Sequence, residues 1–339
     1  MIKSVQRLKV LLSRSKKIVI TTHKGPDGDA IGSSLGLFHL LKQLGHEVRV
    51  ITPNEYAKFL HWLPGNIDVI NYEEREQEAN KITSQADLIF LLDFSHINRI
   101  ASYADSIKNS SATKIMIDHH QDPDKDIADI IFSDTNACST AQMVFEIIEA
   151  MGMKNHLNKV ISECLYVGIM TDTGSFKYAS TTAKTHHIIS ELITAGAENA
   201  KIHDLIYDNS SANRIQMLGY CLNKKLKLYP ENNAAIISLN DEELKRFNFK
   251  KGDTEGFVNY ALAIEGIKFA AFIAEKDGLV KLSLRSKGNF KVNEIANKYF
   301  NGGGHINASG GISELSVNQT IIKIEKIINK YKSELNKTN

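Results

Sequence analysis

The stretch that decides the fold covers residues 17–36 and reads KIVITTHKGPDGDAIGSSLG. A short apolar run leads into a histidine and two aspartates, His23, Asp27 and Asp29, and five of the next seven residues are small. A buried strand, a glycine-rich turn and the start of a helix explain this order. A turn with a helix N-cap accounts for one aspartate, but not for the histidine as well. The stretch therefore predicts a strand and a helix with a functional site between them.

The same alternation of apolar runs and helical patterns continues to about residue 135. Strand-helix alternation of this kind predicts an α/β fold with a parallel, doubly wound sheet. The runs that we interpret as strands are residues 17–21 (KIVIT), 47–53 (EVRVITP), 86–93 (ADLIFLLD), 114–118 (KIMID) and 129–133 (DIIFS).

The length of 339 residues suits two domains, each able to bury a core of its own. After a helical, more polar segment, two hairpin signals follow, PENN at residues 230–233 and KDG at residues 276–278. They indicate a smaller α+β domain that ends in an amphipathic helix near residues 317–335. We expect a first domain at 1–190, a helical linker at 191–220 and a second domain at 221–339.

Composition excludes several classes of protein. The chain has 41 basic and 39 acidic residues, and a net charge of +2 gives no electrostatic footprint for long duplex DNA. Three widely spaced cysteines form neither a disulfide framework nor a zinc motif, and no apolar run reaches the roughly 20 residues of a membrane span. We therefore expect a cytoplasmic protein that binds no membrane. A homodimer is compatible with the sequence.

Histidines and aspartates follow several of the predicted strands. In doubly wound sheets the site lies beyond the carboxyl ends of the strands, so residues at these ends should meet. Asp172 is a further candidate, because it closes the apolar stretch CLYVGIMT and opens a turn. The residues at strand ends are His23, Asp93 and the DHH motif formed by Asp118, His119 and His120.

This convergence predicts a metal centre. At least two imidazoles and four carboxylates packed together without a cation would repel one another and lose solvation. Two divalent ions that share a carboxylate and a water resolve the conflict. Mixed imidazole and carboxylate ligands favour Mn²⁺, with Mg²⁺, Fe²⁺ or Co²⁺ as competitors, and the lack of thiolates argues against structural zinc.

A second group of residues lies in the second domain, in the stretch NGGGHINASGG at residues 301–311. Three successive glycines, Gly302, Gly303 and Gly304, allow backbone amides to approach an anion, and a helix beginning directly after them would add its positive end. The alternative is a purely structural role, as a flexible loop between a helix and a final strand. His305 beside the triplet and Arg285 on the preceding hairpin favour anion binding.

These motifs resemble the DHH phosphoesterase superfamily, in particular its DHH plus DHHA1 branch with bacterial short-oligonucleotide ribonucleases of the NrnA type. The resemblance covers most of the chain. Two small departures, Gly25 where Asn is frequent and Ser309 in place of the usual alanine, remove no ligand. The matching segments are HKGPDGDAIGSS, LLDFS, IDHH, MTDTGSFKY and GGGHINASGG.

The resemblance implies a role for each matching position. His23 and Asp27 would hold one metal, and Asp93 would bridge both ions. Asp118 would orient the histidines, and His120 would face the substrate phosphate. The second metal would be held by Asp29, His119 and Asp172, and the terminal phosphate or nucleotide of the substrate by Arg285, His305 and the backbone of Gly302, Gly303 and Gly304, with the active site in the cleft between the domains.

The activity implied by the resemblance is metal-dependent hydrolysis of short RNA to 5′-mononucleotides and of 3′-phosphoadenosine 5′-phosphate (pAp) to AMP. A phosphodiesterase for cyclic di-AMP or its linear product pApA is the main alternative. An inorganic pyrophosphatase shares the metal motifs but would lack the GGGH segment. A non-catalytic nucleotide sensor on the same scaffold would be expected to have lost metal ligands, whereas all of them are present in this sequence.

Overall fold

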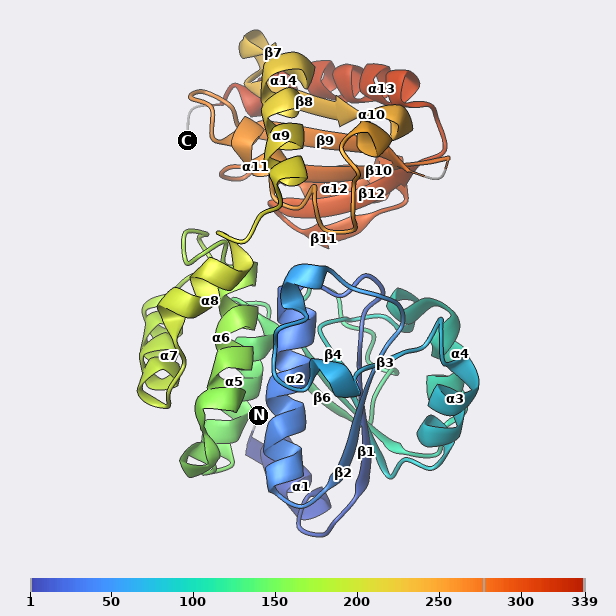
Figure 1. Ribbon diagram of the computed structural model, residues 1–339, viewed down its shortest axis with the longest axis vertical. Coiled ribbons are helices and arrows are strands. Elements are labelled where there is room, and N and C mark those ends of the chain that lie inside the picture. Colours follow the sequence, from blue (N-terminus) through green and yellow to red (C-terminus); the bar gives the residue numbers. More distant parts are fainter. Residues whose placement is uncertain (1, 277, 338–339) are drawn as a thin grey trace. The chain divides into compact units, whose positions relative to one another are not determined.

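The computed structural model describes residues 2–276 and 278–337. The chain divides into two compact units between Asn209 and Ser210, coloured blue to green and yellow to red in Figure 1. This division falls inside the predicted linker at 191–220. The end of helix α7 and the whole of helix α8, described below, lie within the linker range, and both helices belong to the first unit. We describe each unit by itself and call them unit 1 and unit 2.

Unit 1 contains a six-stranded sheet with the strand order β3-β2-β1-β4-β5-β6, in which every pair is parallel. The predicted doubly wound α/β fold is thereby confirmed. All five predicted runs form strands, and a short sixth strand, which the sequence did not suggest, lies at one edge. The strands are β1 (Lys17–Thr22), β2 (Glu47–Thr52), β3 (Ile70–Asn71), β4 (Leu88–Leu92), β5 (Thr113–Asp118) and β6 (Ile130–Ser133).

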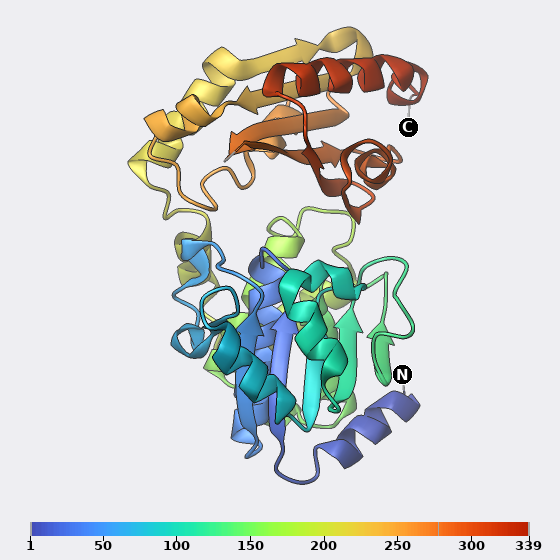
Figure 2. The ribbon, with the colours of Figure 1, turned by 90° about the vertical axis from the view of Figure 1, so that its right-hand side faces the viewer.

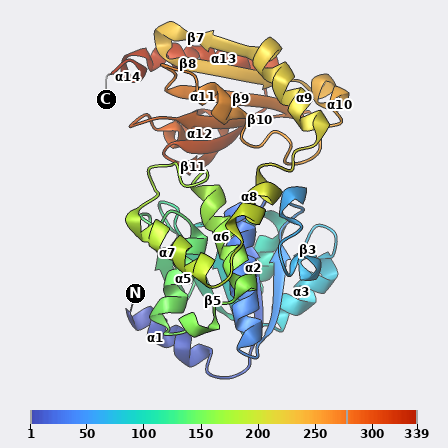
Figure 3. The same ribbon diagram turned by 60° about the vertical axis from the view of Figure 1, so that its left-hand side comes forward.

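Helices cover both faces of this sheet, as the side view in Figure 2 shows. Alternate strand residues such as Ile18 and Ile20 pack with α1, α2, α5 and α6, whereas Val19 and Ile89 pack on the other face with α3 and α4. Helices α7 and α8 lie beside α6 (Figure 3). The bounds are α1 (Ile2–Leu11), α2 (Gly28–Gln43), α3 (Glu76–Ser84), α4 (Ala104–Asn109), α5 (Thr140–Ala150), α6 (Lys159–Asp172), α7 (Ala183–Thr194) and α8 (Asn199–Ile206).

The small residues of the opening stretch let α2 approach α6 closely. A Cβ atom on Gly32 would lie 2.5 Å from the carbonyl oxygen of Cys164. From the other side, a Cβ on Gly168 would lie 2.5 Å from the Cβ of Ala141 and 2.9 Å from Asp29 Oδ1. Such distances leave no space for a side chain, so glycine is required at both positions. This packing brings the C-terminal part of α6 next to the first turn of α2.

Unit 2 contains a mixed six-stranded sheet with the order β11-β12-β10-β9-β8-β7, in which only β8 and β9 are parallel. The two predicted hairpins are the pairs β7–β8 and β9–β10. The strands are β7 (Leu226–Tyr229), β8 (Ala234–Leu239), β9 (Phe269–Lys276), β10 (Leu279–Ser286), β11 (Gly303–His305) and β12 (Ala308–Ser313).

One face of the second sheet packs on α12 and α13, and the other on α9, α10 and α11 (Figure 1). The predicted C-terminal helix is present as α13 followed by the short α14. In the described part of the chain, none of the helices combines the length and apolar character needed to span a bilayer. The bounds are α9 (Ala212–Tyr220), α10 (Asp241–Arg246), α11 (Phe257–Leu262), α12 (Val292–Phe300), α13 (Val317–Lys330) and α14 (Lys332–Leu335).

The sequence suggested a helix directly after the glycine triplet, and this prediction is wrong. Gly303 and Gly304 lie in β11, which pairs with β12, and the next helix begins only at Val317. A Cβ on Gly302 would lie 2.0 Å from the carbonyl oxygen of Gly310, and one on Gly304 would lie 2.6 Å from that of Ala308. Two of the three glycines are therefore needed because the two strand backbones approach each other closely.

Candidate metal centre

Strand register brings three of the predicted residues to one edge of the first sheet. Thr22 at the end of β1 pairs with Leu92 at the end of β4, and Leu92 pairs with Ile117 in β5. The residues that follow in each strand, His23, Asp93 and Asp118, are thus neighbours. The strand order reverses between β1 and β4, and ligands bind at such switch points in open α/β sheets.

The two aspartates of the opening stretch occupy the first turn of α2. Asp27 is the N-cap, and its Oδ1 accepts hydrogen bonds of 3.1 Å from the amides of Asp29 and Ala30. Its second oxygen, Oδ2, lies 3.9 Å from His23 Nε2. Asp29 is 1% exposed and lies inside the cluster. The N-cap interpretation is therefore correct for Asp27, while Asp29 needs partners from elsewhere.

Those partners come from the N-terminus of α5. Asp29 Oδ2 accepts a hydrogen bond of 2.6 Å from the amide of Thr140, and Oδ1 accepts one of 2.8 Å from the amide of Ala141. The first amides of a helix have no partner within the helix and carry partial positive charge. They hold the Asp29 carboxylate in one orientation and favour its negative charge.

His23 is the centre of a first group of metal-binding atoms. Its Nε2 lies 3.5 Å from Asp93 Oδ2 and 3.9 Å from Asp27 Oδ2. Its Nδ1 lies 3.1 Å from the carbonyl oxygen of Lys24, which can only accept a hydrogen bond. The proton of the neutral ring therefore sits on Nδ1, and the lone pair of Nε2 faces the two carboxylates.

His119 is the centre of a second group, built in the same way. Its Nε2 lies 3.5 Å from Asp93 Oδ1, 3.5 Å from Asp172 Oδ2 and 3.8 Å from Asp29 Oδ2. Its Nδ1 lies 3.2 Å from the carbonyl oxygen of Ala137 and donates to it. Asp172, the last residue of α6, thus joins the cluster from a helix end rather than from a strand.

The donor set fits two divalent cations. The separations of 3.5–3.9 Å exceed an ordinary N–H···O bond of about 2.7–3.2 Å. Two ligand atoms that each lie about 2.0–2.3 Å from one ion are separated by about 3–4 Å. A histidine with Nδ1 on a carbonyl oxygen and Nε2 turned to carboxylates has the orientation of a metal ligand. Asp93 belongs to both groups, with one oxygen toward each.

Asp118 and His120 form a pair beside the two groups. His120 Nδ1 lies 2.7 Å from Asp118 Oδ1, and 3.8 Å from Asp93 Oδ1. Asp118 is completely buried, and its Oδ2 has no hydrogen-bond partner among the described residues. The carboxylate therefore orients His120, while His119 is oriented by the backbone of Ala137.

Burial and mutual repulsion disfavour the charge of two carboxylates. Burial, together with the charges of Asp93 and Asp172, raises the pKa of Asp29 well above its usual range. Burial also raises the pKa of Asp172 to about 7, although the nearby His119 acts in the opposite direction. In the absence of a cation, both carboxyl groups therefore keep a proton to higher pH than a free carboxyl group does.

Asp93 and the histidines show the opposite balance. Burial acts to raise the pKa of Asp93, but its interactions with His119 and His23 outweigh burial and hold the pKa well below the usual range. Burial acts to lower the pKa of both histidines, yet the facing carboxylates, above all Asp93, raise the pKa of His23 and raise that of His119 well above its usual value. The cluster therefore attracts positive charge, as protons or as metal ions.

In unit 2, the register of the strands aligns the two predicted anion-binding side chains. Arg285 in β10 pairs with Ala308 in β12, and Ala308 pairs with His305 in β11. Paired residues of antiparallel strands point to the same face, so Arg285 and His305 lie in one row on one face of the sheet. Both are half-buried. The row presents two basic side chains beside the glycine backbone of β11.

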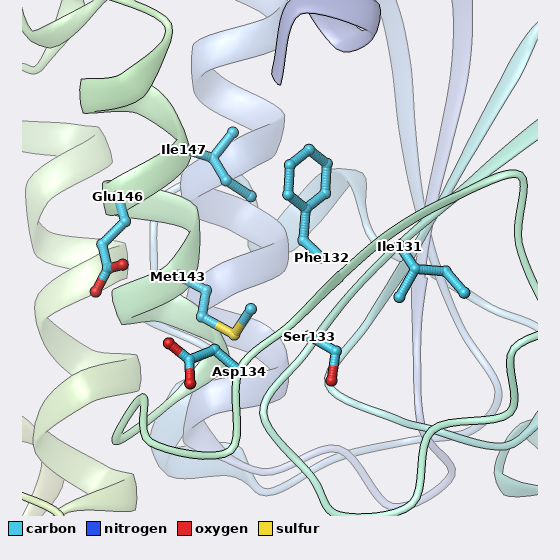
Figure 4. A pocket seen from close by; sticks show the side chains of 7 residues that line it. All are labelled: Ile131, Phe132, Ser133, Asp134, Met143, Glu146 and Ile147. Atoms are coloured by element: carbon cyan, nitrogen blue, oxygen red, sulfur yellow. The ribbon is translucent and has the colours of Figure 1, made fainter. Parts of the chain in front are cut away.

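A pocket in unit 1 lies between β6 and α5 (Figure 4). Four of its lining residues are apolar, and its two carboxylates belong to Asp134 and Glu146. Glu146 is already bonded to Gln142 Nε2 at 2.9 Å and to Lys184 Nζ at 2.8 Å. None of the residues that line the pocket is a predicted site residue.

Sequence reasoning missed one residue at the centre. Thr140 is completely buried and contacts both Asp29 and Asp93. It lies 111 positions after Asp29 in the chain, and a Ser-Thr pair at residues 139–140 resembles any helix N-cap. No local signal distinguishes it.

Comparisons with known proteins agree with this geometry. The family profile for the DHH family N-terminal domain matches residues 17–169, and the profile for the DHHA1 domain matches residues 232–337. The bifunctional oligoribonuclease and PAP phosphatase NrnA of Bacillus subtilis is 30% identical over 86% of this chain and 88% of its own length.

Two solved structures are similar as well. An exopolyphosphatase-related protein from Bacteroides fragilis has a TM-score of 0.95 and 40% identity, over 99% of this chain and 98% of that one. RecJ from Thermus thermophilus in complex with Mn²⁺ has a TM-score of 0.58 and 14% identity, over 98% of this chain and 54% of RecJ. The likeness to RecJ concerns the fold alone.

Proposed function

The chain belongs to the DHH/DHHA1 phosphoesterases, and from this premise we propose that it hydrolyses short oligoribonucleotides to 5′-mononucleotides and pAp to AMP, using two divalent ions, with Mn²⁺ preferred. The observation that carries the proposal is the shared position of Asp93, whose Oδ2 lies 3.5 Å from His23 Nε2 and whose Oδ1 lies 3.5 Å from His119 Nε2. The relative from Bacillus subtilis, with both activities in its name, supports the choice of substrates.

The residues of unit 1 would hold the ions. We assign His23 and Asp27 to one ion and Asp93 to both. Asp29, His119 and Asp172 are assigned to the other ion. When bound, the ions would supply Lewis acidity and lower the pKa of a water molecule, so that it attacks phosphorus near neutral pH.

The protein's own groups would orient the substrate and respond to its charge. Because Asp118 holds His120 through Nδ1, Nε2 is the ring atom assigned to contact a phosphoryl oxygen. With protons on both ring nitrogens, His120 would donate a hydrogen bond from Nε2 to this oxygen and stabilise the negative charge that develops during in-line attack. We assign Arg285, His305 and the backbone of residues 302–304 to the terminal phosphate of the substrate, since a guanidinium binds phosphate in a bidentate manner.

A comparison of substrates tests the proposal. The purified protein, with Mn²⁺ added after chelator treatment, is assayed with pApA, pAp, cyclic di-AMP, pyrophosphate and polyphosphate, the last because one solved relative is described as exopolyphosphatase-related. We expect pApA and pAp to give the highest kcat/KM and AMP to be the product of both. A preference for cyclic di-AMP, pyrophosphate or polyphosphate would overturn the substrate assignment.

The sensor hypothesis gives a different result in the same assay. A non-catalytic nucleotide-binding protein would bind pApA with Mn²⁺ present and release no AMP even at high enzyme concentration. Equilibrium dialysis with labelled pApA separates this outcome from a protein that does not bind nucleotides at all. Bound but unchanged pApA would favour the sensor.

A further inference from the structure

Thr140 contacts two carboxylates of the metal centre: Asp93, which we assign to both ions, and Asp29, which we assign to one of them. Its side-chain hydroxyl donates a hydrogen bond of 2.9 Å to Asp93 Oδ1, while its backbone amide donates one of 2.6 Å to Asp29 Oδ2. The residue is completely buried at the first position of α5. A single residue thus joins the carboxylate that follows β4 to the one in the first turn of α2.

The hydroxyl determines how the Asp93 carboxylate is turned. A carboxylate rotates about a broad, roughly two-fold torsion, so burial alone does not fix the plane of the group in which one oxygen faces each histidine. With Oδ1 bonded to Thr140, Oδ1 lies 3.5 Å from His119 Nε2 and Oδ2 lies 3.5 Å from His23 Nε2. The orientation in which Asp93 serves both groups is the one that the threonine hydroxyl stabilises.

The helix itself does not need this hydroxyl. The N-cap of α5 is Ser139, whose Oγ accepts a hydrogen bond of 3.0 Å from the amide of Gln142. The Thr140 amide is satisfied by Asp29 whatever side chain residue 140 carries. The contribution of the hydroxyl is therefore directed at Asp93 rather than at the stability of α5.

We propose that Thr140 is a positioning residue that couples the two metal-binding groups by fixing the orientation of Asp93. This inference rests on the proposed two-metal function. Groups that orient metal ligands typically contribute about 10–100-fold in metal affinity when they are removed. Loss of the hydroxyl should weaken the binding of at least one ion by that amount, because the shared ligand then adopts other orientations.

The test compares Thr140→Val with Thr140→Ser and with a matched control, Thr83→Val. Thr83 is also completely buried in unit 1, but its hydroxyl bonds to Ala79 and Tyr103 on the far side of the sheet. Mn²⁺ affinity and stoichiometry are measured by calorimetry on the metal-free proteins, and coupling between two bound Mn²⁺ ions is measured by electron paramagnetic resonance.

We expect the wild type, Thr140→Ser and Thr83→Val to bind two coupled Mn²⁺ ions with affinities within about threefold of one another. Thr140→Val should lose about 10–100-fold in affinity for one ion, and its spectrum should shift toward that of uncoupled Mn²⁺. Wild-type affinity and coupling in Thr140→Val would overturn the inference. Should this variant not fold, as judged by circular dichroism, Thr140→Ala carries the same prediction without a branched side chain.

Measurements on the wild type alone can contradict the two-metal proposal. A wild type that binds fewer than two Mn²⁺ ions, or that binds two without coupling, contradicts the proposed function before any variant is measured. Two coupled ions in wild type and Thr140→Val alike contradict only the role of Thr140.

Discussion

The two units differ in where they place left-handed backbone. Among the described residues of unit 2, the non-glycine residues with positive φ are all asparagines, the residue type that tolerates this conformation best. In unit 1 they include alanine, serine and phenylalanine, for which it is strained. The residues are Asn233, Asn248 and Asn301 in unit 2, and Asp93, Ala101, Asp122, Ser175 and Phe176 in unit 1.

Four of these five positions in unit 1 lie close in sequence to the candidate site residues, and Ala101 is the exception. Asp93 has a φ of 65° itself, Asp122 follows the DHH motif, and Ser175 and Phe176 follow Asp172. In unit 2, Arg285 and His305 lie instead in regular strands and are half-buried. Strain of this kind persists where the surrounding structure determines the conformation, and it gathers at functional sites. The comparison predicts that substitutions of the candidate ligands in unit 1 lower kcat. Substitutions of Arg285 or His305 in unit 2 should instead raise KM.

The largest effect is expected from Asp93→Asn. Asparagine keeps the shape and tolerates a φ of 65°, whereas alanine would add strain. The variant therefore removes the negative charge and replaces one of the two ligand oxygens by an NH2 group, which cannot bind a metal ion. We expect kcat on pApA to fall by about a thousandfold or more, because transition-state stabilisation by charge is the main term in such reactions. Single-turnover assays with saturating Mn²⁺ measure this loss.

Asp105→Asn is the matched control for this variant. Asp105 is exposed in the first turn of α4 and has no part in the cluster, so its kcat should stay within about twofold of the wild type. If Asp93→Asn retains more than a tenth of the wild-type kcat, Asp93 is not the shared ligand.

A smaller effect, and one of a different kind, is expected from Arg285→Ala. Hydrogen bonds to charged groups contribute about 1.5–3 kcal/mol, which corresponds to about a 10–100-fold rise in KM for pApA. The kcat should change little, and KM for ApA, which lacks the terminal phosphate, should change less than KM for pApA. Steady-state kinetics on both dinucleotides distinguish the two parameters.

Lys281→Ala provides the control, since Lys281 is an exposed cation on the same strand. It should leave the ratio of the two KM values as in the wild type. A fall in kcat without any rise in KM for Arg285→Ala would mean that Arg285 acts in the chemical step. The predicted difference between the two units, kcat for unit 1 and KM for unit 2, would then be wrong.

Acid should weaken Mn²⁺ binding in unit 1. The metal-free Asp172 carboxyl has a pKa of about 7 because it is buried, so below pH 7 a metal ion must displace its proton. The dissociation constant should rise as pH falls from 8 to 6, approaching about tenfold per unit for this group alone at the acid end. Calorimetry in buffers of different ionisation enthalpy should show more protons released at pH 6 than at pH 8, and Asp172→Asn should release fewer. Affinity independent of pH over this range would contradict the prediction.

Sequence reasoning reached the strands and the residues at their ends for a definite physical reason. Buried parallel strands consist of apolar runs, and the carboxyl ends of such strands share one edge of the sheet, so the proximity of His23, Asp93 and Asp118 follows from topology. Which atom faces which depends on register and side-chain torsions. These decide that Asp118 orients His120, while His119 is oriented by the backbone of Ala137.

Contacts between segments that are distant in the sequence could not be predicted from the sequence. Nothing near Gly32 shows that Cys164 will press against it, and nothing near Thr140 shows that its amide will meet Asp29. The glycine triplet at 302–304 misled in the same way. Glycine suits both an anion-binding turn before a helix and the close approach of two strands, and only the tertiary fold decides between these.

The smallest expected effect tests the strain itself. Ala101 interrupts the 3₁₀ segment Ile97–Tyr103 with φ 51° and ψ −130°, a conformation open mainly to glycine, and such a residue costs about 1–3 kcal/mol. Ala101→Gly should relieve this cost, offset in part by about 0.4–1 kcal/mol of added freedom in the unfolded chain. We expect the unfolding free energy to rise by about 1 kcal/mol, measured by urea denaturation. Ala104→Gly, in the ordinary conformation at the start of α4, should lower it by about 0.5–1 kcal/mol. Equal destabilisation by both variants would mean that no strain is stored at Ala101, and the contrast between the two units would then rest on Ser175 and Phe176.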